Sequence, residues 1–87
     1  MPESPDPRRK RLHFRCHHMG TAENDVLFGR FADRCLADLD GDQLARLERL
    51  LEENDTVLFK WVTGLEAPPP AFDDDVMRLL MDINKTL

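Results

Sequence analysis

The stretch TAENDVLFGRFADRCLADL, residues 21–39, decides the fold because it carries the strongest helical pattern in the chain. Its apolar residues recur three or four positions apart, a spacing that places them on one face of an α-helix. The residues on that face are Leu27, Phe28, Phe31, Ala32, Cys35, Leu36 and Leu39. We therefore expect a helix over residues 21–39 at the centre of the hydrophobic core.

A second helix is predicted before this stretch. Pro7 suits the first turn of a helix that runs through the basic segment to about Met19. Leu12, Cys16 and Met19 stand on one stripe of it, at positions i, i+4 and i+7. Gly20 suits the left-handed position that commonly ends a helix, so we expect a helix–helix joint there.

Two further helices are predicted after residue 39. Asp40 suits the N-cap of the first and Gln43 its partner in a capping box. The apolar positions of that helix are Leu44, Leu47, Leu50 and Leu51. Asn54 or Asp55 breaks it, and a short helix follows. The apolar positions of this short helix are Leu58, Trp61, Val62 and Leu65.

The end of the chain predicts a proline-rich spacer and a last helix. The segment APPPAF, residues 67–72, is typical of an extended spacer. Three aspartates, residues 73–75, suit a helix N-terminus, where negative charge is favoured. The apolar positions of the last helix are Phe72, Val76, Leu80, Ile83 and Leu87. The fold class predicted is an all-α, compact small bundle of about five short helices: one domain over residues 8–87 behind a flexible N-terminal segment, residues 1–7.

Length and composition narrow the class of protein. The 87 residues, 41% hydrophobic and 33% charged, suit one small globular domain without room for a deep catalytic cleft. No apolar run approaches the length of a membrane span, and the start lacks the apolar region of a secretory signal. Two cysteines without such a signal suit free thiols in a reducing compartment. We predict a cytoplasmic protein without direct membrane insertion.

Charge is unevenly distributed along the chain. Residues 1–19 carry five basic and two acidic side chains, a net charge of +3, so the remainder carries −8 of the total of −5. An acidic body repels phosphate, and the basic segment lacks the interleaved aromatic residues of single-strand binders. We therefore favour an acidic protein partner over nucleic acid. A helical module that binds nucleic acid or another acidic partner through its basic first helix stays the alternative.

The segment RCHHMGTAEND, residues 15–25, raises the question of a metal or catalytic site. His13, Cys16 and His17 share one helix face at positions i, i+3 and i+4, but a structural zinc site wants a second ligand pair. Cys35 has no close His or Cys neighbour to form that pair. The sequence also lacks a glycine-rich phosphate loop. We predict no functional metal site and no catalytic residues, hence no enzyme.

Several motifs in order resemble the succinate dehydrogenase assembly factors. They are RRKRLHFR (residues 8–15), HxGTxExD (18–25), LFGRFAD (27–33), LADL (36–39) and LFKWVTG (58–64). Each motif alone is weak, whereas their order and spacing together are fairly specific. The resemblance implies a compact five-helix bundle that promotes covalent attachment of FAD to the flavoprotein subunit of succinate dehydrogenase or of the related fumarate reductase.

The family signature is Arg-Gly-x-x-Glu at the end of the first helix. Gly20 and Glu23 match it, and Asp25 stands where an acid commonly follows. Met19 occupies the position of the arginine. Methionine offers flexible apolar contact where arginine offers a fixed fork of donors. The nearby His18 or His17 substitutes only in part, since a neutral imidazole donates one hydrogen bond.

The resemblance also implies how such a protein works. The factor docks on the flavoprotein, whose own histidine forms the bond to the flavin 8α-methyl group, and the factor supplies positioning. Gly20 would allow close approach of the partner to the backbone. Glu23 would present a hydrogen-bond acceptor to the partner. Within the chain, we also expect Glu23 to accept from the first backbone amides of the second helix. Arg8, Arg11 and Arg15 would steer docking. No cofactor is expected to bind tightly to the chain alone, and FAD is met through the partner.

Overall fold

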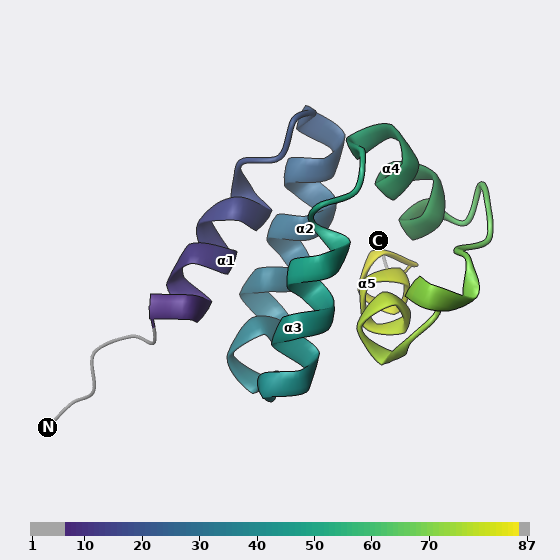
Figure 1. The fold of residues 1–87 in the computed structure, drawn as a ribbon. Helices are drawn as coiled ribbons and strands as arrows, with labels where there is room; N and C mark the ends of the chain where they lie inside the picture. The colour runs from purple at the N-terminus through teal and green to yellow at the C-terminus, as the bar shows by residue number, and fades with distance from the viewer. Residues whose placement is uncertain (1–6, 86–87) are drawn as a thin grey trace, which may run out of the picture.

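The computed structural model describes residues 7–85, and Figure 1 shows them as a bundle of helices. Within these residues there are five α-helices and two single turns of 3-10 helix, and no strand. The α-helices are α1 (Pro7–His17), α2 (Ala22–Cys35), α3 (Gly41–Leu50), α4 (Asp55–Thr63) and α5 (Asp75–Lys85). The predicted all-α bundle is confirmed. Residues 1–6 of the predicted flexible segment, and Leu87, lie outside the described residues.

Helix α2 forms the centre of the bundle, as its sequence predicts. In Figure 1 α1 lies on one side of it and α4 and α5 lie on the other, and all three contact it. Phe28 and Phe31 are fully buried. The helix ends at Cys35, and the remaining predicted turn continues as 3-10 helix η1 (Leu36–Asp38). The buried hydrophobic residues of the core are Leu12, Cys16, Leu27, Phe28, Phe31, Ala32, Leu36, Leu39, Leu44, Leu47, Leu50, Leu51, Leu58, Trp61, Val62, Val76, Met77 and Leu80.

Gly20 differs from the sequence prediction. Helix α1 ends at His17, and among the described residues only Gly64 has a positive φ, of 83°. The prediction of a left-handed Gly20 was therefore wrong. The structure gives a steric reason for glycine instead: a Cβ atom at this position would lie 1.9 Å from Oδ2 of Asp55. A side chain at position 20 would therefore have to displace the Asp55 carboxylate, which lies at the start of α4.

Local sequence sets the starts of α3 and α4. The predicted capping box of α3 is present, with the Asp40 carboxylate accepting from the Gln43 amide and the Gln43 side chain accepting from the Asp40 amide. Asn54 caps α4 by accepting from the amide of Thr56 at 2.8 Å. These three residues explain why the chain restarts a helix twice within fifteen positions.

Three predictions for the C-terminal third were wrong. Gly64 ends α4 in a left-handed conformation, so Leu65 lies beyond the helix and is 71% exposed instead of extending its apolar face. The proline-rich segment is not wholly extended, because Pro70–Phe72 form the 3-10 turn η2. Phe72 consequently stacks on Trp61, with ring centroids 5.3 Å apart, and does not begin α5.

The start of α5 agrees with its aspartates. The Asp74 carboxylate accepts from the amide of Met77 at 3.0 Å, and Asp75 lies in the first turn. None of the helices within residues 7–85 has the length and apolar character needed to cross a membrane.

Candidate functional site

The connection between α1 and α2 is held by the N-cap residue of α2 and by an acidic side chain in the first turn of that helix. Thr21 caps α2 by accepting from the amide of Asn24 at 3.2 Å. The Asp25 carboxylate accepts from the amide of Met19. The acid that reaches back to a backbone amide is therefore Asp25, and the prediction that Glu23 does so was wrong. Glu23 is exposed, and its carboxylate makes no hydrogen bond or ion pair within residues 7–85.

This connection is anchored to the start of α4. Asn24 is fully buried, and its Nδ2 donates to the backbone carbonyl of Asp55 at 2.9 Å. A surface hollow opens beside the anchor and is lined by Thr21, Glu23, Asp55, Thr56 and Phe59. We call these residues, with His18, Met19, Gly20 and Asp25, the α1–α2 joint. Glu23 thus lines the hollow with three residues of α4, and Gly20 lies beside one of them, Asp55. The sequence did not predict this proximity, because more than thirty positions separate the two segments.

Met19 and His18 occupy different environments in the joint. Met19 is half-buried and packs against the core. His18 is exposed and stacks on Phe14, with ring centroids 3.9 Å apart and an interplanar angle of 16°. Its Nδ1 lies 2.8 Å from the carbonyl oxygen of Phe14, and because a carbonyl only accepts, Nδ1 is the donor. Phe14, 61% exposed, is a surface aromatic residue that the sequence analysis did not single out.

Two of the three predicted steering arginines bond within the domain. Arg8 makes a bidentate ion pair with Glu48 of α3, at 2.9 and 2.8 Å, and its guanidinium lowers the pKa of that carboxyl. Arg15 donates to the carbonyl of Leu51 at 3.2 Å and forms an ion pair with Glu52. Arg11 is exposed and makes no ion pair within residues 7–85. Arg11 lies on the same face of α1 as Phe14. His18 follows directly after the end of α1 and stacks on Phe14.

With this geometry described, comparison with known proteins identifies the family. The Sdh5 family model, described as flavinator of succinate dehydrogenase, matches residues 10–84. The chain belongs to this family. The match runs from the second turn of α1 to the last turn of α5.

Curated relatives agree with membership of the Sdh5 family. The chain is 36% identical over 75 residues to the mitochondrial succinate dehydrogenase assembly factor 2 of Drosophila grimshawi, covering 84% of this chain and 51% of the relative. It is 34% identical over 84 residues to the mitochondrial assembly factor 2-B of Drosophila melanogaster, covering 93% of this chain and 54% of the relative. The chain therefore spans about half the length of the curated relatives it matches.

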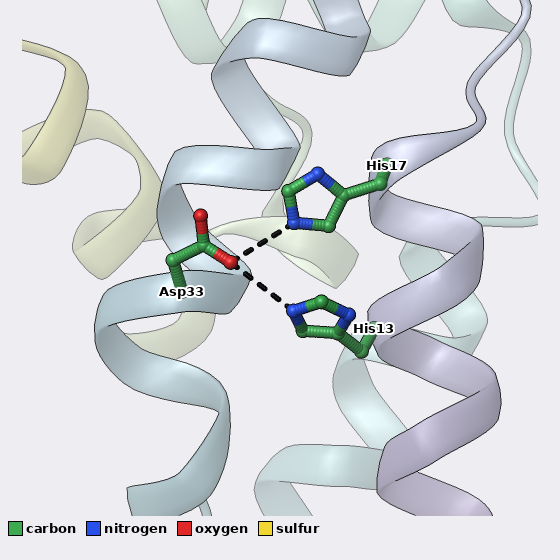
Figure 2. A group of neighbouring side chains, drawn as sticks. All are labelled: His13, His17 and Asp33. Carbon is green, nitrogen blue, oxygen red and sulfur yellow. Dashed lines mark hydrogen bonds and ion pairs between the residues drawn. The ribbon is translucent and has the colours of Figure 1, made fainter.

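A second group of side chains in this Sdh5-family chain comes from the facing helices α1 and α2. Figure 2 shows His13 and His17 of α1 pointing towards Asp33 of α2. Their Nε2 atoms lie 3.1 and 3.0 Å from the same carboxylate oxygen, Oδ1. Cys16, which the sequence placed on the same face as these histidines, is fully buried in the core instead. Burial raises the pKa of its thiol to about 12. The predicted apolar stripe that includes Cys16 is confirmed, and Asp33 is the residue that faces the two histidines.

Proposed function

We propose that this chain is an assembly factor that binds the flavoprotein subunit of succinate dehydrogenase, or of the related fumarate reductase, and promotes covalent attachment of FAD to that subunit. The observation that carries the proposal is the family match over residues 10–84, which includes nearly all of α1 and α5 and everything between them. The names of the curated relatives, succinate dehydrogenase assembly factor 2, support the same role.

The chemistry of the joint supports a positioning role without catalysis. In our proposal the flavoprotein supplies the histidine that forms the bond to the flavin 8α-methyl group, and this chain holds the flavoprotein in the reactive conformation. Glu23 offers an ionised acceptor that is not used inside the domain. Gly20, exposed beside it, leaves the backbone accessible to a close partner. A donor on the flavoprotein, such as an arginine or a backbone amide, suits this surface.

The same residues argue that FAD is met only through the partner. The carboxylates of Glu23, Asp25 and Asp55 all lie at the joint. Their negative charge repels the diphosphate of FAD, so the joint does not fit the dinucleotide. We accordingly place FAD in the flavoprotein and propose that the isolated chain does not bind it tightly.

The binding step is tested by co-purification of the flavoprotein subunit with Glu23→Ala. Loss of a charge-assisted hydrogen bond across the interface is expected to weaken capture by roughly tenfold or more. The matched control is Glu66→Ala, which removes another exposed acid, beyond the far end of α4. Equal capture of the flavoprotein by wild-type chain and Glu23→Ala would contradict the assignment of this surface.

Met19→Arg tests the departure from the family signature. The arginine stem can cover the core where methionine packs, while the guanidinium reaches solvent. The restored fork of donors is expected to increase capture of the flavoprotein several-fold. An unchanged capture would contradict the idea that Met19 weakens docking.

The cellular location is a further proposal. The curated relatives are named as mitochondrial, whereas the sequence of this chain predicts the cytoplasm. We keep the cytoplasm as the prediction, and fractionation of the source cells with an antibody against the chain tests it: recovery in the mitochondrial fraction would contradict it.

A further inference from the structure

We propose that His13, His17 and Asp33 form a binding site for one divalent transition-metal ion of the zinc class. The three side chains come from two helices, with the histidines one turn apart on α1 and the aspartate facing them from α2 (Figure 2). The proposal is independent of the proposed assembly role and differs from the sequence prediction of no metal site, which the zinc titration below tests.

The distances suit an ion at the centre of the three groups. One ligand atom from each residue lies within 4.8 Å of the other two. Zinc lies about 2.0–2.2 Å from nitrogen and oxygen ligands, so tetrahedral neighbours stand roughly 3.3–3.6 Å apart. The Nε2 atoms of His13 and His17 already lie 3.1 and 3.0 Å from Oδ1 of Asp33. Small rotations of the side chains about their existing positions therefore admit the ion.

The backbone of α2 provides the room for this arrangement. A Cβ atom at Gly29 would lie 2.8 Å from both Cε1 and Nδ1 of His17. Because position 29 carries no side chain, the imidazole of His17 rests against α2, with its ring centroid 4.5 Å from that of His13. Both histidines and the carboxylate are thus held by packed helices, which reduces the reorganisation that metal binding requires.

The types of ligand atom indicate which metal ion the site would bind, and the exposure of the side chains indicates where its fourth coordination position lies. Two imidazoles with one carboxylate suit zinc, nickel or copper, whereas magnesium and calcium prefer sets of oxygen ligands. Arg34 lines the hollow that also contains His17 and Asp33, and it repels any divalent ion, so affinity here depends on the bonds to the two imidazoles and the carboxylate. The side chains of His13, His17 and Asp33 are 52%, 34% and 58% exposed, so the fourth position faces solvent.

In the metal-free protein the same groups are joined by hydrogen bonds. Asp33 accepts from both imidazoles through the same carboxylate oxygen, Oδ1. To bind the ion, each neutral imidazole would carry its ring proton on Nδ1 in place of Nε2. The ion would then join α1 to α2 by bonds stronger than the hydrogen bonds it displaces. Metal binding should therefore stabilise the fold.

The test is a titration of untagged protein with zinc near neutral pH, in competition with a chromogenic chelator. We expect one ion per chain with a dissociation constant on the order of 10 μM, a value between adventitious surface histidines and closed four-ligand sites. Zinc should also raise the thermal midpoint, and an equal concentration of magnesium should not. The absence of saturable binding at one ion per chain would overturn the proposal.

Three variants assign the ligands. His17→Ala and the equally sized Asp33→Asn should each weaken zinc binding at least tenfold and remove the thermal shift. His18→Ala is the matched control, because this histidine is not one of the three proposed ligands and donates to the carbonyl of Phe14. Unchanged affinity in the first two variants, or an equal loss in His18→Ala, would overturn the assignment. Melting curves of the metal-free variants establish that each one folds.

Discussion

The hydrogen bond from Asn24 to the start of α4 should stabilise the joint, and a mutation at Asn24 measures by how much. Asn24 is fully buried, and its Nδ2 donates to the Asp55 carbonyl at 2.9 Å. Its Oδ1 is also buried and has no hydrogen-bond partner within residues 7–85. The amide is therefore satisfied on one side only, which limits the stability that it contributes. We predict that Asn24→Ala lowers the free energy of unfolding measurably without preventing folding.

The size of the effect follows from the lost bond and the lost packing. A net hydrogen bond contributes about 0.5–1.5 kcal/mol, and the small cavity adds to that loss. We expect a total of about 1–2 kcal/mol for Asn24→Ala. For a domain of this size, each kcal/mol lowers the thermal midpoint by about 4–8 °C. Asn24→Asp should cost more, because it keeps the size of the side chain but turns an acceptor towards the Asp55 carbonyl.

Urea denaturation followed by circular dichroism measures these free energies. Glu23→Ala, in the same turn of α2, is the matched control: its carboxylate has no bond inside the domain, so its loss should cost no more than about 0.5 kcal/mol. Asn24→Ala within 0.3 kcal/mol of wild type, or Asn24→Asp more stable than Asn24→Ala, would refute the idea that this amide anchors the joint.

Three further predictions concern charge, the thiols and the glycine of the joint. The ion pair that joins Glu48 to α1 lowers the pKa of its carboxyl from 4.5, so the stability it adds is present above about pH 4.5 and is lost as the pH falls through the lowered value. The difference in thermal midpoint between wild type and Glu48→Gln should therefore shrink below about pH 4.5, and a constant difference would count against this pair. With Cys35 replaced by serine, the buried Cys16 thiol should react with a thiol reagent only at the rate of unfolding, and fast labelling of the native protein would contradict its burial. Gly20→Ala should cost about 0.5–1.5 kcal/mol by displacing the Asp55 side chain. In an Asp55→Ala background that cost should disappear, and a double-mutant cycle without coupling would show that the two residues do not meet.

The sequence predicted those features that depend on neighbouring residues. The apolar spacing of residues 27–36 placed α2 in the core, because burial along a helix follows its 3.6-residue period. The capping box of Asp40 and Gln43 is likewise a contact across three positions. Leu65 was assigned wrongly because the same period continues past Gly64, and only the left-handed conformation of that glycine ends the helix. Local pattern therefore fixed the helices more reliably than their last residues.

Contacts between residues on different helices could not be predicted from the sequence. The apolar stripe predicted the burial of Cys16, but it did not predict that Asp33 of α2 approaches His13 and His17. Gly20 was identified correctly as a special position but for the wrong reason, because Asp55 is distant in the chain. The internal bonding of Arg8 depends in the same way on the position of α3. Such contacts require the orientation of whole helices, which residue spacing does not encode.

The central claim is that this chain promotes covalent attachment of FAD to a flavoprotein subunit. It is tested most directly by expressing the flavoprotein of succinate dehydrogenase in cells that lack their own assembly factor, with and without this chain. Flavin fluorescence of the flavoprotein band after denaturing electrophoresis measures the covalent product. We predict strong fluorescence only when the chain is present, and reduced fluorescence with Glu23→Ala. Equal covalent flavin with and without the chain would contradict the account.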